Sequence, residues 1–209
     1  PDVTATLLRL LLFSLSGKSV AEGKSRLATR LGDRVASDLL DLVDDPTLPD
    51  GLASRPFDAE GTPARRTPLI EGGVLRSFLH NSDTARRTGQ ANTGHAQRSY
   101  ASTLGVAPSN LILEAGSGAS LDDGVIVTDL MGVHAGANPI TGDVSLQGLG
   151  LRVEDGEARP VENFALSFNL FDLLERVNAV GESLEWRPGG EGMIAAPTLR
   201  VDALSFAGA

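Results

Sequence analysis

Residues 4–15, TATLLRLLLFSL, are apolar on nearly every side when placed on a helix. A helix of that kind is stable in water only where other parts of the protein surround it. The run is broken by Arg9 and Ser14, is too short to span a bilayer, and lacks the small-residue cleavage site of a signal peptide. The sequence therefore predicts a globular fold that encloses its first helix.

After a second predicted helix at residues 20–31, patterns typical of β-structure dominate the chain. Apolar runs on either side of a glycine turn predict a hairpin at residues 65–79. A second hairpin is predicted at residues 143–164, because the dipeptide Asp155-Gly156 favours a tight turn between two runs of that length. We expect most neighbouring strands to be antiparallel, since hairpins join them.

The remaining elements complete an α+β pattern. Strands are expected at residues 39–43, 110–116, 124–130 and 196–208, helices at 82–89 and 169–181, and a long loop at 89–109. The predicted fold is one domain, residues 1–209, of mostly antiparallel β-structure. It is sheet- or barrel-like, with an N-terminal helix pair and one or two further helices.

The composition limits which partners the chain can take. Its formal net charge is −9, so phosphate backbones and anionic lipid surfaces would repel it, and we expect neither nucleic acid nor a membrane as partner. It has no cysteine, which excludes disulfides, thiolate nucleophiles and cysteine-bound metal ions. The lack of cysteine also fits a reducing, cytoplasmic location.

No local pattern of residues forms a complete catalytic or metal site. The three histidines, His80, His95 and His134, are not spaced as a helical metal-binding pair, and no G-x-S-x-G motif occurs. His134 lies in the glycine-rich stretch MGVHAGANPITGD, and two interpretations stay open for it. In the first interpretation, folding brings His134 together with His95 and a carboxylate such as Asp143 to form a metal site. In the second, His134 is a loop residue without such partners. The paired carboxylates of DDP at residues 44–46 and FDAEG at residues 57–61 fit turns better than an acid–base pair.

Four stretches resemble the C-terminal half of the TldD/PmbA family, in which PmbA is also called TldE. They are FDAEGTPARRTPLIEGGVLRSFLHNSDTARRTG, SNLILEAG, ANPITGDVSLQGLGLRVEDGEARPVE and PTLRVDALSFAG, at residues 57–89, 109–116, 137–162 and 197–208. The resemblance implies a largely β C-terminal domain, with the family's N-terminal α/β domain absent from this chain. It also implies a cytoplasmic protein linked to the maturation and degradation of small or unfolded peptides.

The resemblance also indicates which branch of the family the chain is similar to. TldD-type members are metalloproteases with an HExxxH motif upstream of a VASxL…VDD stretch, which matches Val35-Ala36-Ser37 and Asp44-Asp45 here. Counting back from these residues places the motif on residues 8–13, which read LRLLLF and offer no metal ligand. The family's cysteine ligand has no counterpart either. The resemblance therefore implies a PmbA-like chain with no catalytic residue, no metal ligand and no cofactor, and zinc is expected only in a TldD-like partner.

We expect a metal-free subunit that forms a homodimer or pairs with a TldD-like protease subunit and holds an unfolded or extended peptide. The predicted peptide-binding surface lies beside the glycine-rich residues 118–124. Its residues are His134, Asn138, Thr141, Gly142, Asp143 and Ser145. Two alternatives stay open: a metallopeptidase in its own right with relocated ligands, and a purely structural assembly module. The peptide substrate and the identity of the partner are not deducible from the sequence.

Overall fold

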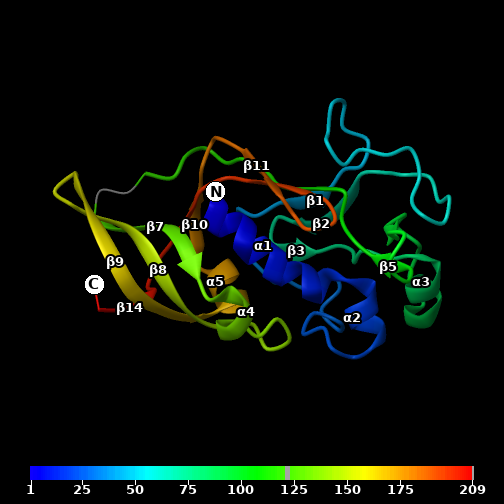
Figure 1. The fold of residues 1–209 in the computed structure, drawn as a ribbon, viewed down its shortest axis with the longest axis horizontal. Coiled ribbons are helices and arrows are strands. Elements are labelled where there is room, and N and C mark those ends of the chain that lie inside the picture. The colour runs from blue at the N-terminus through cyan, green and yellow to red at the C-terminus, as the bar shows by residue number, and fades with distance from the viewer. Residues whose placement is uncertain (121–122, 209) are drawn as a thin grey trace.

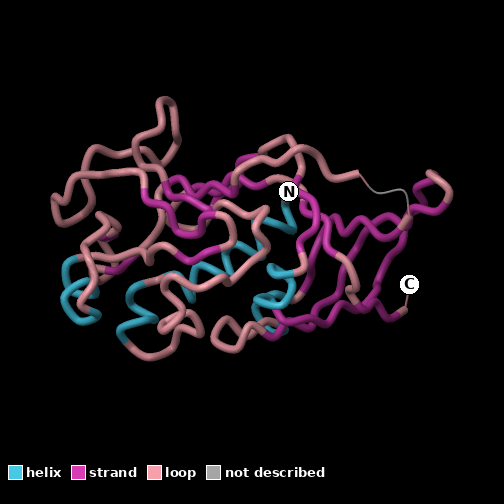
Figure 2. Tube along the Cα trace, turned by 180° about the vertical axis from the view of Figure 1, so that it is seen from behind, coloured by secondary structure: helices cyan, strands magenta, loops and turns pink. Residues whose placement is uncertain are grey.

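The structure is a computed structural model that describes residues 1–120 and 123–208. Figure 1 shows a long β-hairpin at one end of the molecule, short helices and loops at the other end, and helix α1 between them. Seen from behind, the end that holds the hairpin consists mainly of strands, while loops and short helices make up much of the other end (Figure 2). The strand-rich and loop-rich parts of the fold therefore lie toward opposite ends of the longest axis of the molecule.

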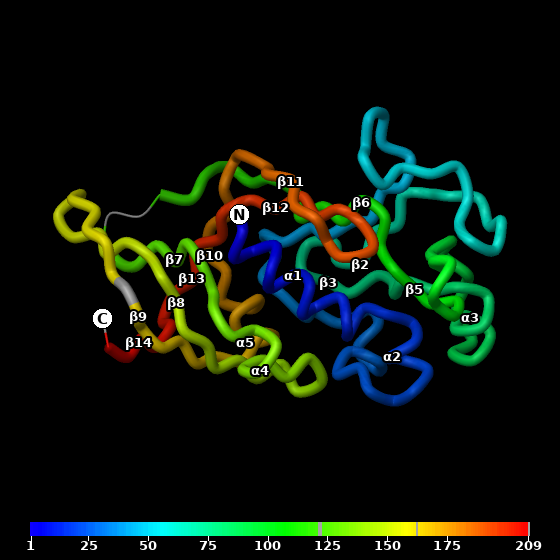
Figure 3. Tube along the Cα trace, in the orientation of Figure 1, coloured from blue at the N-terminus to red at the C-terminus, as the bar shows by residue number. Residues whose placement is uncertain are grey.

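Helix α1, Asp2–Leu15, is enclosed as its apolar sequence predicts. Leu8, Leu11 and Leu15 are at most 2% exposed and belong to the main hydrophobic core. Figure 3 shows the N-terminus beside the late strands β11 and β12, and Arg9 Nη2 donates a hydrogen bond of 2.6 Å to the carbonyl of Pro188. Within the described residues, neither α1 nor any other helix combines the length and apolarity that crossing a membrane requires.

The second predicted helix, at residues 20–31, is wrong. Helix α2 spans only Gly17–Ala21, and Gly23, with φ of 68°, turns the backbone out of the helix. Glycine adopts this left-handed conformation without strain and weakens a helix interior. Turns then lead to β1, Leu42–Asp44, which is the predicted strand at residues 39–43 displaced toward its C-terminal end.

A six-stranded sheet packs against α1 in the order β11-β12-β6-β1-β2-β3. Its other strands are β2 Thr67–Glu71, β3 Val74–Leu75, β6 Asn110–Leu113, β11 Glu185–Pro188 and β12 Met193–Ala196. All neighbours are antiparallel except β12 and β6, which are parallel. The predicted hairpin at residues 65–79 is confirmed as β2 and β3, joined at Gly72 and Gly73 with positive φ.

The second large sheet has four antiparallel strands in the order β14-β9-β8-β7. Its strands are β7 Gly124–Met131, β8 Asp143–Glu154, β9 Glu157–Asn169 and β14 Ser205–Ala207. The predicted Asp155-Gly156 turn is confirmed: both residues have positive φ, and Glu154 pairs with Glu157. A β-bulge between Gly148 and Gly150 shifts the register along the hairpin.

The smaller elements depart from the predicted pattern in three places. The smaller elements are α3 Ser82–Thr88, β4 Ala96–Gln97, β5 Gly105–Val106, α4 Val133–Gly136, α5 Leu170–Glu175, β10 Val177–Val180 and β13 Leu199–Val201. The predicted helix at 169–181 is α5 followed by β10, the final strand is divided into β13 and β14, and the loop at 89–109 contains the β4–β5 pair. The α+β class is confirmed, and each sheet is open in the part of the chain that the structure describes.

Helix α3 begins with a capping box, which provides a test of the local structure. Asn81 Oδ1 accepts a hydrogen bond of 2.9 Å from the backbone N–H of Thr84, whose hydroxyl in turn accepts one from the Asn81 backbone. We expect Asn81→Ala to lower the free energy of unfolding by about 1–2 kcal/mol, because the first turn of the helix loses its side-chain acceptor. Urea denaturation checks this, and Ser82→Ala is the matched control. If Asn81→Ala lowers the free energy of unfolding no more than Ser82→Ala does, the capping role of Asn81 is contradicted.

Candidate functional site

A surface pocket of about 680 Å³ lies where α4 and the following turn meet the start of the β8–β9 hairpin. Its lining residues are Ala135, Gly136, Ala137, Asn138, Pro139, Asp143, Val144, Ser145, Ser167 and Phe168. One wall is backbone and small side chains from α4 and its turn, and the other is the exposed face of β8 and β9. The pocket is therefore shaped by a close approach of backbone segments as well as by side chains.

The glycine-rich sequence explains how the α4 turn forms this wall. Gly136 packs so tightly on β8 that an added Cβ would lie 2.1 Å from the Ser145 carbonyl oxygen. Asn138 Oδ1 accepts hydrogen bonds from the backbone N–H groups of Ile140 and Thr141, at 3.0 and 3.3 Å, which is the turn chemistry that Asn favours. Gly142, with φ of 82°, returns the chain into β8. The pocket wall thus depends on residues with no side chain or with a turn-forming one.

Asp143 supplies an exposed carboxylate at the pocket. The side-chain amide of Asn169 donates hydrogen bonds to Asp143 Oδ1, at 2.9 Å, and to the Thr141 carbonyl, at 3.0 Å. The pKa of Asp143 is lowered, mainly by the hydrogen bond from Asn169, then by one from Thr141, with a smaller contribution from the charge of Arg26. The carboxylate is therefore ionised at neutral pH.

Two hydroxyl groups lie beside this carboxylate. Ser145 on β8 pairs with Ser167 on β9, and their Oγ atoms are 3.3 Å apart on the exposed face of the sheet. Phe168 adds a partly buried ring to the lining. The pocket thus combines a negative charge, two groups that can donate or accept hydrogen bonds, and a small apolar surface.

The structure brings part of the predicted peptide-binding set together. Asn138, Asp143 and Ser145 line the pocket, and Thr141 and Gly142 form the turn that holds it. His134 is exposed on α4 and is not part of the lining. Residues 121–122 of the adjacent glycine-rich segment lie outside the described residues. Peptide binding at this surface stays a prediction.

Ser167 and Phe168 were not predicted to line the pocket. The Asp155-Gly156 turn could have indicated where they lie, because the position of a hairpin turn sets which residues of the two strands face each other. Counting back from the turn without a bulge, however, places Ser145 opposite Leu166, whereas the structure pairs it with Ser167. The sequence pattern did not reveal the one-residue shift.

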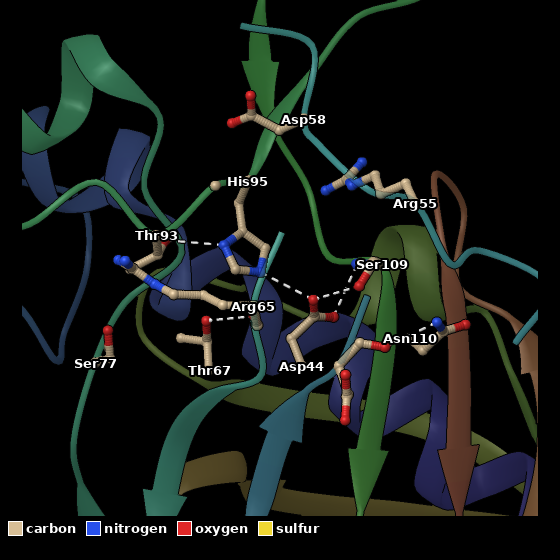
Figure 4. A network of polar contacts seen from close by, with 12 residues as sticks. Asp44, Arg55, Asp58, Arg65, Thr67, Ser77, Thr93, His95, Ser109 and Asn110 are labelled. Atoms are coloured by element: carbon tan, nitrogen blue, oxygen red, sulfur yellow. Dashed lines mark hydrogen bonds and ion pairs between the residues drawn. The ribbon is translucent and has the colours of Figure 1, made fainter. Parts of the chain in front are cut away.

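His95, the second histidine of the proposed metal set, is fully buried in a polar network (Figure 4). Its Nε2 lies 2.9 Å from Asp44 Oδ2, and its Nδ1 lies 2.9 Å from Thr93 Oγ1. Ser109 donates to the same carboxylate twice, from its backbone N–H at 2.8 Å and from its hydroxyl at 2.5 Å. The network joins strand β1 to the segments before β4 and β6.

The order of contacts in this network excludes a catalytic triad. The Ser109 hydroxyl donates to Asp44, and the two ring nitrogens of His95 contact Asp44 and Thr93, so the imidazole is not placed to take the serine proton and make it a nucleophile. Asp44, Ser109 and His95 are all at most 1% exposed, so a substrate has no access to them. We assign the network a structural role.

The relocated metal site is not formed in the structure. His95 lies in the buried network next to β4, whereas His134 and Asp143 are exposed near α4. In Figure 1, α4 is well separated from β5, the strand that pairs with β4. Among residues 1–120 and 123–208, no three His, Asp or Glu side chains gather in a way that could hold a metal ion. Residues 8–13 of α1 offer no ligand either, because Leu8 and Leu11 pack in the core and Arg9 donates to the Pro188 carbonyl.

The sequence pattern of the PmbA/TldA metallopeptidase C-terminal domain matches residues 1–208. The chain belongs to this family. Over 205 residues it is 32% identical to the metalloprotease PmbA of Escherichia coli O157:H7, an alignment that covers 96% of this chain and 44% of that protein. It is also 36% identical over 176 residues to a metalloprotease of Methanothermobacter thermautotrophicus, covering 80% of this chain and 37% of that protein.

The fold agrees with the sequence match. The crystal structure of TldE from Thermococcus kodakarensis is similar to this chain with a TM-score of 0.91 and 27% identity, covering 100% of this chain and 49% of that one. The predicted similarity to the PmbA (TldE) branch of the TldD/PmbA family is confirmed. The chain spans less than half the length of the PmbA protein of Escherichia coli O157:H7 and of the Methanothermobacter thermautotrophicus metalloprotease.

Proposed function

We propose that this PmbA/TldE-type chain acts within a metal-free subunit of a TldD-type metalloprotease system that matures or degrades unfolded peptides. The observation that carries the proposal is that the side chains of α1 pack in the hydrophobic core. Where TldD-type members are expected to carry HExxxH, this helix presents leucines that are buried in the hydrophobic core. Leucine has no lone pair for a metal ion, and replacing one with histidine would disturb the packing around α1.

We also propose that the subunit holds an extended peptide at the α4 pocket for the metal centre of a partner. In this proposal the pocket's side chains hold the peptide, in place of backbone pairing to a strand edge. Residues 143–145 of β8 pair with β9 on one side, and on the other side Ala137 forms a bridge with Val144, so this part of β8 offers little free strand edge for a peptide backbone. Contact would instead involve the pocket's side chains, chiefly Asp143, Ser145 and Ser167.

The partner in this proposal is a TldD-like subunit, with a homodimer as the other possible assembly, and the location is the cytoplasm. We further propose that residues 1–209 are one domain. The main hydrophobic core supports this, since it joins α1, one face of the six-stranded sheet, α5 and β10. Zinc belongs to the partner in this assembly.

The proposal predicts how much zinc the purified protein binds. After growth with added zinc and dialysis, we expect less than about 0.1 zinc ion per chain, because a stable site needs three or four ligands around one point. Elemental analysis of the dialysed protein measures the ratio, and a TldD-type relative treated in parallel is the positive control. Stoichiometric zinc that a His134→Ala substitution removes would contradict the proposal.

A further inference from the structure

The α4 pocket has one charged lining residue, the carboxylate of Asp143. Its other polar side chains are the hydroxyls of Ser145 and Ser167 and the amide of Asn138, and Pro139 and Phe168 provide apolar surface. A group that combines an aliphatic stem with a positive charge matches this lining, since the stem covers apolar surface while the charge reaches the carboxylate. A second carboxylate in the pocket would be repelled.

The surroundings of the pocket favour the same charge. Residues 99–209, which include all of its lining, contain 15 Asp and Glu residues but only five Arg and no Lys. An excess of one sign over a surface raises the local concentration of ligands of the opposite sign. The second half of the chain therefore attracts basic peptides and repels acidic ones before any specific contact forms.

A nearby cation does not neutralise this site. Arg26 already donates from Nη1 to the Thr141 carbonyl at 2.8 Å, and its guanidinium carbon lies 5.0 Å from the centre of the Phe171 ring. Arg26 is absent from the pocket lining, and its charge is the smallest of the contributions that lower the pKa of Asp143. It supports the turn that carries Asp143 and leaves the pocket without a positive charge of its own.

We propose that the α4 pocket takes a basic side chain, lysine or arginine, of the bound peptide, with Asp143 as its counter-ion and Ser145 and Ser167 as hydrogen-bond acceptors. This inference rests on the proposed peptide-holding function and adds a substrate class to it. The subunit would then select the position of the peptide by one basic residue, while the partner supplies the hydrolytic chemistry.

Three labelled, unfolded peptides that differ at one central residue test the proposal by fluorescence anisotropy. The central residue is lysine, norleucine, which has a similar length without the charge, or glutamate. We expect the lysine peptide to bind about tenfold more tightly than the norleucine peptide at low salt, equivalent to about 1.4 kcal/mol, and the difference to shrink as salt is added. The glutamate peptide should bind most weakly.

Two variants of Asp143 separate the pocket from a general charge effect. Asp143→Asn keeps an oxygen for the Asn169 amide and should abolish the preference for lysine, and Asp143→Lys should reverse it in favour of glutamate. Asp129→Asn is the matched control, because it removes one exposed carboxylate from β7 outside the pocket. Circular dichroism establishes that each variant is folded.

The possible results distinguish the inference from the function on which it rests. If the three peptides bind equally, or if Asp129→Asn weakens the lysine preference as much as Asp143→Asn does, the basic-residue pocket is wrong but peptide holding stands. If no peptide binds to the protein or to its complex with a TldD-type partner, both are wrong. A preference for lysine that only the Asp143 variants alter supports both.

Discussion

Asp44→Asn is expected to lower the free energy of unfolding by about 3–5 kcal/mol, the largest effect of any single substitution considered for this chain. Asp44 is fully buried and accepts hydrogen bonds from the backbone and the hydroxyl of Ser109, and its carboxylate also contacts His95. An amide in its place turns one acceptor into a donor that faces these groups, which leaves buried polar atoms without partners. Urea denaturation measured by fluorescence and by circular dichroism gives the change.

Asp38→Asn is the control for this prediction, because Asp38 is exposed and its substitution should change the unfolding free energy by less than about 0.5 kcal/mol. Ser109→Ala should give an intermediate loss of about 1–3 kcal/mol, since it removes one donor and keeps the carboxylate. An Asp44→Asn protein within about 1 kcal/mol of the original would show that the network does not join the loops to the sheet as described.

The second large effect concerns pH. Burial, with a smaller contribution from the charge of His95, lowers the pKa of His80 to about 4. In the unfolded chain the same imidazole titrates near its ordinary pKa of about 6.5, so between these two values the unfolded state binds the extra proton. The free energy of unfolding should therefore fall as pH drops from about 6.5 to 4, by at most about 3 kcal/mol from this group.

The environment of His80 explains the sign. The side chain is 1% exposed, its Nδ1 lies 3.1 Å from Thr84 Oγ1, and its Nε2 has no hydrogen-bond partner in the described structure. With both ring nitrogens protonated, the imidazole would carry a positive charge, and its Nε2 has no partner to stabilise that charge. Comparing the pH dependence of unfolding in the original protein and in His80→Gln isolates the contribution, because carboxylates titrate alike in both. Equal slopes between pH 4 and 6.5 would contradict the buried, neutral imidazole.

The sequence was most informative where one local pattern decides the structure. Apolar residues around the whole of α1 predicted that the helix is buried. The dipeptide Asp155-Gly156 predicted the hairpin turn because it favours positive φ, which both residues adopt. It was least informative where a pattern fits two structures. Leu170, Leu173, Leu174 and Val177 are spaced as on one face of a helix, but the helix ends at Glu175, and Val177–Val180 pairs with β13 instead.

The candidate site was only partly predictable for a related reason. The turn-forming residues Asn138 and Gly142 are local signals, and the turn that they form supports one wall of the pocket. Its opposite wall depends on the register of a long hairpin, and one bulge near Gly148 moves every pairing beyond it by one residue. Registers that contain a bulge cannot be counted from the turn alone.

The buried network gave no signal in the sequence. Asp44 is 51 residues from His95 and 65 from Ser109, so only the tertiary fold brings them together. Sequence patterns reported the aspartates here as turn residues, and Asp45 does accept a hydrogen bond of 2.9 Å from the Thr47 backbone in that way. Its neighbour Asp44 has a different role, which periodicity and spacing do not reveal.

One measurement decides whether this chain belongs to a non-catalytic subunit or to a protease. It is peptide cleavage by the purified protein, alone and with a separately purified TldD-type partner. We expect no cleavage of an unfolded, labelled peptide by the protein alone. With the partner, cleavage should be stopped by a chelator and should be lost when the partner's HExxxH glutamate is replaced. Chelator-sensitive cleavage by this protein alone would contradict the metal-free subunit.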